Sequence, residues 1–231
     1  MRRIGILGGM GPEATILLMQ KVVKAVPAQD DGDHIPLIVD QNTQVPSRIA
    51  HLLQGGPVDP GPVLADMAHR LAHAGAEALA MPCNTAHHYA DAIRGAATVP
   101  FIDMIALSVA HAKAQAAPGG RIGILGSPAL RRTGLFDAPL AQVGLTAVYP
   151  ADEDRMLAAI RQIKSEGPGP DPRAVLHDAS CALLDTGAQV QMIACTEFSL
   201  IPDAVAKDAA AFDTLDQLVQ AIVSFAKSAP T

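Results

Sequence analysis

One short segment occurs twice in this chain, and the repetition constrains the fold more than any other feature. The sequence IGILGG at residues 4–9 returns almost unchanged as IGILGS at residues 122–127. Each half also carries a cysteine after a short apolar run, 75 positions beyond the second glycine of the segment for Cys83 and 69 positions for Cys195. The repetition predicts two related lobes, and it can place two thiols face to face across one cleft.

The composition favours a protein with a well-buried aliphatic core. Of the 231 residues, 49% are hydrophobic, 17% are charged and only 3% are aromatic, which disfavours disorder. Two lobes of about 100–120 residues agree with usual domain sizes. The net charge is −6, and no basic cluster exceeds the pair Arg131-Arg132. Nucleic-acid binding is therefore not expected, because it needs a basic surface.

The cellular context is inferred from the chain start and the cysteines. The apolar run after Arg3 is interrupted by Gly8-Gly9 and then by Pro12, too early for an export signal. No stretch reaches the ~18 apolar residues of a membrane span. Three cysteines in a chain without an export signal read as reduced thiols. We therefore expect a cytoplasmic protein without a membrane partner.

Short β-branched runs alternate with longer Ala/Leu-rich segments, which predicts parallel sheets covered by helices on both faces. The expected strands are 3–7, 35–39, 78–81, 99–102, 121–125, 145–148, 190–193 and 210–212. The expected helices are 13–26, 62–74, 86–96, 105–116, 156–164, 172–186 and 214–227. We assign residues 1–102 plus about 208–231 to the first lobe and residues 103–207 to the second.

The turn after the first predicted strand is a candidate anion site. Residues 9–14 (GMGPEA) fit a loose Gly-x-Gly-x-x-Ala pattern, in which backbone N–H groups and a helix N-terminus face a ligand. A dinucleotide fits poorly: Pro12 crowds the turn, and Asp40, 29 positions beyond Gly11, is too far along the chain. The pattern favours a smaller anion such as a carboxylate over a purely structural turn.

Both repeated cysteines are predicted at the carboxyl ends of strands, where open α/β sheets bind ligands. We expect the N–H groups that follow each thiol to favour its thiolate, below the ordinary thiol pKa of about 8.5. Cys181 lies in an apolar helical stretch and is assigned to the core. A papain-like pairing of Cys83 with His87 or His88 leaves the second thiol unexplained, and we interpret the histidine pair as the start of a helix.

The sequence contains no motif typical of a metal site or of a cofactor site. The chain contains no Cys-x-x-Cys and no His-x-x-x-His around the cysteines, and no lysine-centred pyridoxal phosphate motif. Each half contains one basic residue in a segment that we predict to be an acid-poor loop, Arg48 in the first half and Lys164 in the second. Such cations at the mouth of a cleft can hold carboxylates, arginine in a bidentate manner.

Four segments together resemble the aspartate/glutamate racemase family, in particular its aspartate racemase branch. They are residues 5–15 (GILGGMGPEAT), 45–48 (VPSR), 82–87 (PCNTAH) and 195–197 (CTE). The resemblance extends over about residues 4–225. It implies two pseudo-symmetric Rossmann-like lobes, each a mainly parallel sheet flanked by helices, with the active site in the cleft between them. It also implies a cofactor-independent enzyme that is usually a homodimer.

The resemblance also implies roles for individual residues. Cys83 and Cys195 would be the two catalytic bases, and Arg48 and Lys164 would grip the side-chain carboxylate. The residues that would hold the α-carboxylate region are Met10, Gly11, Asn84, Thr85 and Thr196, with Ser127 at a family position often occupied by Thr or Ser.

We therefore expect racemisation of a small dicarboxylic amino acid, aspartate or glutamate, by a thiol and a thiolate that exchange roles. Two alternatives remain open. One is an isomerase or lyase of the maleate isomerase kind that uses one cysteine as nucleophile. The other is a non-catalytic binder of small carboxylates or of a dinucleotide.

Overall fold

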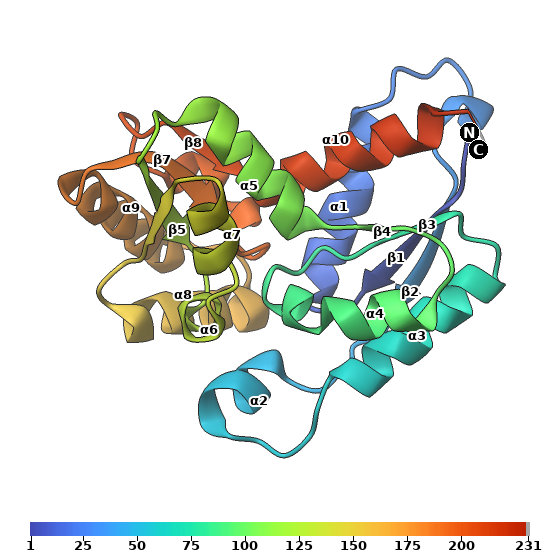
Figure 1. The fold of residues 1–231 in the computed structure, drawn as a ribbon, viewed down its shortest axis with the longest axis horizontal. Helices are drawn as coiled ribbons and strands as arrows, with labels where there is room; N and C mark the ends of the chain where they lie inside the picture. Colours follow the sequence, from blue (N-terminus) through green and yellow to red (C-terminus); the bar gives the residue numbers. More distant parts are fainter. Residues whose placement is uncertain (230–231) are drawn as a thin grey trace. The chain divides into compact units, whose positions relative to one another are not determined.

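Each half of the chain forms a four-stranded parallel sheet, as the repeated segment predicts (Figure 1). The computed structural model describes residues 1–229. The strand order is β2-β1-β3-β4 in the first half and β6-β5-β7-β8 in the second. Counted within each half, the two orders are the same, so the halves repeat a topology as well as a sequence.

All eight predicted strands are present, which confirms the α/β fold class. The first-half strands are β1 (Ile4–Gly8), β2 (Leu37–Gln41), β3 (Ala78–Ala80) and β4 (Phe101–Ile102). The second-half strands are β5 (Arg121–Leu125), β6 (Thr146–Val148), β7 (Ala188–Ile193) and β8 (Ala211–Asp213). Their ends differ from the predicted ends by up to two residues.

The seven predicted helices are also present, with one divided. They are α1 (Pro12–Lys24), α3 (Gly61–His73), α4 (Ala90–Ala96), α5 (Met104–Gln115), α8 (Glu153–Glu166), α9 (Pro170–Asp185) and α10 (Thr214–Lys227). A 3₁₀ turn, η2 (Thr85–Tyr89), precedes α4 in the stretch predicted as one helix. The remaining 3₁₀ turns are η1 (Asp31–Asp33), η3 (Phe198–Leu200) and η4 (Pro202–Ala204).

Three short helices are additional to the prediction: α2 (Arg48–Gln54), α6 (Pro128–Thr133) and α7 (Asp137–Gln142). Two of them start on a serine cap, since the Ser47 hydroxyl accepts from the N–H of Ala50 and the Ser127 hydroxyl accepts from the N–H of Ala129, both at 3.2 Å. Both end on a left-handed glycine, Gly55 or Gly134.

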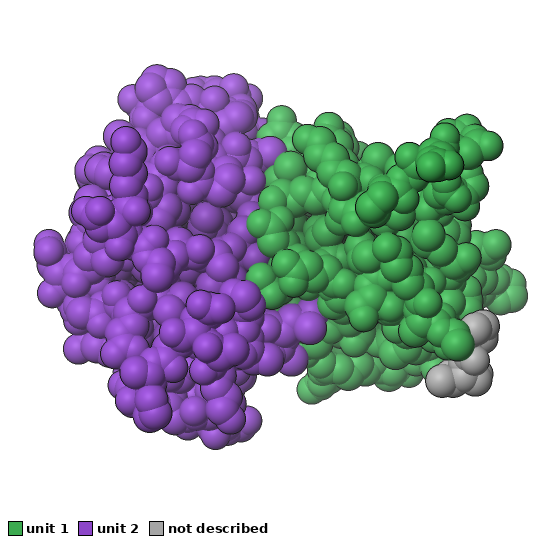
Figure 2. All heavy atoms as spheres, turned by 90° about the horizontal axis from the view of Figure 1, so that it is seen from above, with its two compact units in different colours: residues 1–104, 215–231 green, residues 105–214 purple. Residues whose placement is uncertain are grey.

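The chain divides into two compact units (Figure 2). Unit 1 comprises residues 1–104 and the closing segment from Leu215, and unit 2 comprises residues 105–214. The sequence places the corresponding boundaries at 102 and about 208. Helix α10 therefore belongs to the first sheet, although it follows the last strand of the second.

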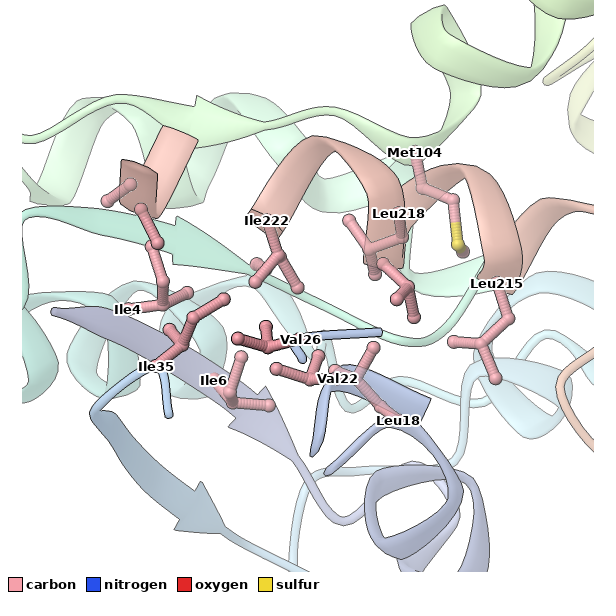
Figure 3. Packing of buried hydrophobic residues seen from close by; sticks show 14 residues of the cluster. Ile4, Ile6, Leu18, Val22, Val26, Ile35, Met104, Leu215, Leu218 and Ile222 are labelled. Carbon is pink, nitrogen blue, oxygen red and sulfur yellow. The ribbon is translucent and has the colours of Figure 1, made fainter. Parts of the chain in front are cut away.

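The sheet of unit 1 is buried on both faces. On one face, Ile4 and Ile6 of β1 pack with α1 and α10 in a cluster that includes Leu18 and Leu218 (Figure 3). On the other face, Leu7 packs with α3 and α4. Side chains alternate across a strand, so successive residues of β1 supply both clusters. Full burial of each such Leu or Ile contributes about 1.5–3 kcal/mol to folding.

Unit 2 has the same two-layer cover. One cluster contains Ile122 and Ile124 of β5 with α5, α6 and α7. The other contains Leu125 of β5 with α8 and α9, and it includes Cys195. Among the described helices, none is long and apolar enough to cross a membrane.

The repeated glycines let a helix lie close to the central strand of each sheet. A Cβ on Gly5 would lie 2.8 Å from the Cβ of Ala76 and 3.1 Å from the Cβ of Leu71 on α3. A Cβ on Gly123 would lie 2.9 Å from a methyl carbon of Leu183 on α9. The same packing requirement therefore accounts for the first glycine of the repeated IGILG segment in both halves.

Candidate active site

The two cysteines follow corresponding strands, each at the point where the strand order of its sheet reverses. Cys83 follows β3, which lies beside β1, and Cys195 follows β7, which lies beside β5. Parallel sheets bind ligands outside the carboxyl ends of the strands at such a reversal. Both thiols are buried, each residue 8% exposed. Each unit thus carries one buried thiol where its sheet is expected to bind a ligand.

The turn after β1 is fixed by its own side chains. The Gly9 N–H donates to the Thr15 hydroxyl at 2.9 Å, and that hydroxyl donates to the Gly11 carbonyl at 3.3 Å. Gly9 has φ +90°, and a Cβ there would lie 2.4 Å from the backbone of Asn42. Of the backbone N–H groups in this predicted anion site, that of Gly9 is therefore already bound by Thr15.

The Met10 side chain lies in the apolar cluster of unit 1 that also holds Cys83, Val45 and Tyr89. Unit 1 therefore gathers the turn after β1, the loop before α2 and the thiol after β3 around one buried cluster. Gly11 caps the N-terminus of α1, with Pro12 as the first helical residue. Asn84 is the buried residue before η2, and Thr85 is the first residue of η2.

His87 is bound to the backbone on both sides of its ring. Its Nδ1 lies 2.9 Å from the Cys83 carbonyl, and its Nε2 accepts from the Met104 N–H at 3.2 Å. Because Nε2 accepts, Nδ1 carries the hydrogen and the ring is neutral. Burial lowers the pKa of His87, with the Cys83 carbonyl opposing the shift. His87 therefore orients the Cys83 backbone and is not a base for the thiol, while His88 is exposed.

Arg48 is the first residue of α2, so the expectation of a loop position is wrong. Its guanidinium is half-buried and donates to the carbonyls of Val45 and Pro46 at 3.1 and 2.8 Å. The pKa of Tyr89 is raised to about 12. Burial is the largest cause, the charges of Asp59 and Cys83 act in the same direction, and the Arg48 charge opposes them. Arg48 and Cys83 thus both act electrostatically on one tyrosine.

In unit 2, Cys195 is joined to a buried carboxylate. Its thiol donates to Glu197 Oε2 at 2.9 Å, and Glu197 Oε1 forms an ion pair with the Lys164 ammonium. The Glu197 side chain is 9% exposed and that of Lys164 is 42% exposed. Lys164 lies in the last turn of α8, not in a loop. Cys195 and Lys164 are therefore brought together through Glu197.

The expectation that the following N–H groups favour the thiolate is wrong for Cys195. Burial raises the pKa of the Cys195 thiol, and the charge and hydrogen bond of Glu197 raise it further. The Lys164 charge and the Glu197 backbone N–H oppose this shift but do not reverse it. Cys195 is accordingly a protonated thiol near neutral pH.

The other residues singled out in the sequence of the second unit are Ser127, Thr196 and Cys181. Ser127 is the N-cap of α6, and Thr196 is buried directly after Cys195. Cys181 is only half-buried and lies 3.6 Å from His177 Nε2, so its assignment to the core is wrong. The buried stripe of α9 runs through Leu176, Ser180 and Leu183, and Cys181 falls beside it.

Two residues near the cysteines, Glu197 and Tyr89, had no role predicted from the sequence. Glu197 is two positions from Cys195, a spacing that could have drawn attention to it. Tyr89, whose hydroxyl lies 2.6 Å from His51 Nδ1, gives no sequence signal. Within residues 1–229, no group of three or more His, Cys, Asp or Glu side chains could hold a metal ion.

Comparison with known proteins identifies relatives over nearly the whole chain. The family model described as Asp/Glu/Hydantoin racemase matches residues 7–222. The broad specificity amino-acid racemase RacX of Bacillus subtilis (strain 168) is 24% identical over 231 residues, 96% of each chain.

Two solved structures show the same fold. Picrophilus torridus aspartate racemase superposes with a TM-score of 0.84 at 22% identity, covering 100% of this chain and 96% of that one. An aspartate racemase homologue from Pyrococcus horikoshii OT3 gives a TM-score of 0.74 at 21% identity, covering 99% of this chain and 100% of that one.

Proposed function

The chain belongs to the Asp/Glu/hydantoin racemase family, and we propose that it racemises an amino acid without a cofactor, using Cys83 and Cys195 as the two bases. The observation that carries the proposal is the matched placement of the thiols. Each follows the strand beside the central strand of its own sheet, and each is buried. We propose that the two units present these thiols to opposite faces of one substrate carbon.

The reaction exchanges one proton for another. A thiolate removes the α-proton, the electron pair of the C–H bond moves into the α-carboxylate, and the other thiol delivers its proton to the opposite face. Cys195 is suited to the thiol role in one direction, because the Glu197 carboxylate accepts its hydrogen. Cys83 then acts as the thiolate. In the opposite direction the two residues exchange roles.

The α-hydrogen is a much weaker acid than a thiol, so the charge that develops on the α-carboxylate must be stabilised. Preorganised donors in a water-poor site supply this kind of stabilisation. We propose the side chains of Asn84, Thr85 and Thr196 and the backbone of Met10 and Gly11 as those donors, with Ser127 beside them. Asn84 and Thr196 are buried, at 2% exposure each, which favours such a role.

We propose aspartate or glutamate as the substrate, with Arg48 and Lys164 binding its side-chain carboxylate. Both cations are accessible to a ligand: Arg48 is half-buried, and the Lys164 side chain is 42% exposed. The likeness to an aspartate racemase and to a broad specificity racemase makes the substrate range a question for measurement. Neutral amino acids therefore belong in the panel.

The test is α-proton exchange in deuterated water. Incubation of the protein with L-aspartate or L-glutamate is expected to give the D-enantiomer with deuterium at the α-carbon, and the reverse from the D-enantiomer. Chiral chromatography with mass spectrometry measures both products. Absence of exchange with every amino acid of the panel would refute the proposal. Covalent trapping of substrate on a single cysteine would indicate an isomerase or lyase instead.

A further inference from the structure

The two cysteines have different surroundings, although they follow corresponding strands. The Cys195 sulfur donates to a carboxylate that is itself bound to an ammonium group. Within the described residues, no hydrogen bond reaches the Cys83 sulfur, and the contact from His87 is to the Cys83 backbone carbonyl. The repeated topology therefore carries two unlike thiol sites.

The position of Glu197 fits a role in controlling a proton. Its side chain is 9% exposed, and burying a carboxylate is costly unless both oxygens have partners. One oxygen has Lys164 and the other has the Cys195 hydrogen. The charged groups that act on Cys195 are the Glu197 carboxylate, which raises the pKa of the thiol, and the Lys164 ammonium, which lowers it.

We propose that Glu197 is a positioning residue that holds the proton on Cys195 in the resting enzyme, and that Lys164 moderates this hold through its ion pair with the carboxylate. The inference rests on the proposed racemase function and deepens it. It assigns Cys195 as the acid and Cys83 as the base in the resting state.

This assignment gives Lys164 a second role, which is to stabilise the negative charge left on Cys195 after proton transfer. When the thiol of Cys195 has passed its proton to the substrate, two negative groups face each other, the Cys195 thiolate and the Glu197 carboxylate. The Lys164 ammonium is the positive charge next to them. Loss of Lys164 therefore weakens proton delivery from Cys195, besides removing a contact to the side-chain carboxylate of the substrate.

The first test is the pH dependence of thiol alkylation in Glu197→Gln. Iodoacetamide reacts with the thiolate, and mass spectrometry follows Cys83, Cys181 and Cys195 separately in the same sample. The amide keeps the size of the side chain and one oxygen that can accept the thiol hydrogen, but it removes the charge. A unit charge at 2.9 Å changes the thiol–thiolate balance about tenfold even at the dielectric constant of water.

The lower nucleophilicity of a more acidic thiol cancels part of that gain. Alkylation of Cys195 at pH 7 is therefore expected to rise about threefold or more in E197Q, with Cys83 unchanged. In Lys164→Met, alkylation of Cys195 is expected to move in the opposite direction, with its pH profile displaced to higher pH. Glu166→Gln and Lys207→Met alter exposed residues of the same unit and serve as matched controls.

The second readout is the pH profile of kcat/KM for α-proton exchange. Its alkaline limb reports loss of the proton from the catalytic acid. The limb is expected to move to lower pH in E197Q and to higher pH in K164M. A side chain with a merely structural role would lower the rate without moving the limb.

The outcomes separate this inference from the proposed function. If the protein exchanges no α-proton but Cys195 responds to both variants as expected, the racemase proposal fails and the role of Glu197 stands. If exchange occurs and Cys195 alkylation in E197Q is unchanged or slower, the role of Glu197 is refuted. Should E197Q not fold, K164M decides alone, because its expected change has the opposite sign to a general loosening of the site.

Discussion

Replacement of His87 by asparagine tests how the Cys83 site is held. The ring bridges the Cys83 carbonyl at 2.9 Å and the Met104 N–H at 3.2 Å. Asparagine keeps a donor near the position of Nδ1 but does not supply the acceptor for Met104. A buried backbone group that loses its partner costs about 1–3 kcal/mol, and the lost ring volume adds about 1 kcal/mol. We expect H87N to be about 2–4 kcal/mol less stable at pH 7.5.

The same variant is expected to be less sensitive to acid. Burial lowers the pKa of His87 below its ordinary value of 6.5. Below pH 6.5 the unfolded chain binds a proton that the folded protein excludes, so the wild type loses stability as the pH falls. The loss is at most about 1.4 kcal/mol per pH unit. From pH 7.5 to 5.5, wild type should therefore lose up to about 1.4 kcal/mol that H87N does not lose.

Urea unfolding at the two pH values measures both effects. His88→Asn is the matched control, because His88 is the exposed neighbour of His87 and should change stability little at either pH. Contributions of the other histidines cancel in the comparison between variants. If wild type and H87N lose the same stability between pH 7.5 and 5.5, His87 is not excluded from protonation in the folded state and the reasoning fails.

The remaining predictions concern the thiols and one glycine. Serine at Cys83 or at Cys195 should lower α-proton exchange about 10²–10⁴-fold, whereas serine at Cys181 should leave the exchange rate unchanged; loss of activity in the Cys181 variant would contradict the site. Gly9→Ala should destabilise the protein by about 3 kcal/mol or more in urea unfolding, because its φ is +90° and its Cβ would lie 2.4 Å from backbone. Gly32→Ala, which has no atom within 4 Å of its Cβ, should cost little in the same assay.

The strands and long helices could be predicted because their signals are local. Residues 122–125 form a short apolar run after Arg121, glycines at 120 and 126 bound the segment, and the strand occupies residues 121–125. The short helices α2 and α6 could not be found from periodicity, because six or seven residues give less than two turns of pattern. Their serine caps and closing glycines are the signals that were available.

The candidate residues could be named from the sequence, but their environments could not. The ion pair of Glu197 with Lys164 joins positions 33 apart, on a loop and on α8. Burial of Cys195, followed by the charge and hydrogen bond of Glu197, raises the pKa of this thiol, opposite to the shift expected from backbone N–H groups alone. The hydrogen bond from the Gly9 N–H to Thr15 likewise depends on how α1 packs against the turn that precedes it. Sequence motifs identify the groups, whereas their charges and partners depend on packing.

A racemase does not need two identical thiol sites, and the two units of this chain do not supply them. Mirror-image substrates have equal free energies, so the ratio of kcat/KM in the two directions is fixed at unity whatever the enzyme does. Selection can therefore tune each thiol site separately. One site has a carboxylate on the sulfur of Cys195, and the other has an imidazole on the backbone of Cys83. Such asymmetry is expressed in kcat and KM individually, so a change at Glu197 that alters kcat/KM for one enantiomer must alter kcat/KM for the other by the same factor.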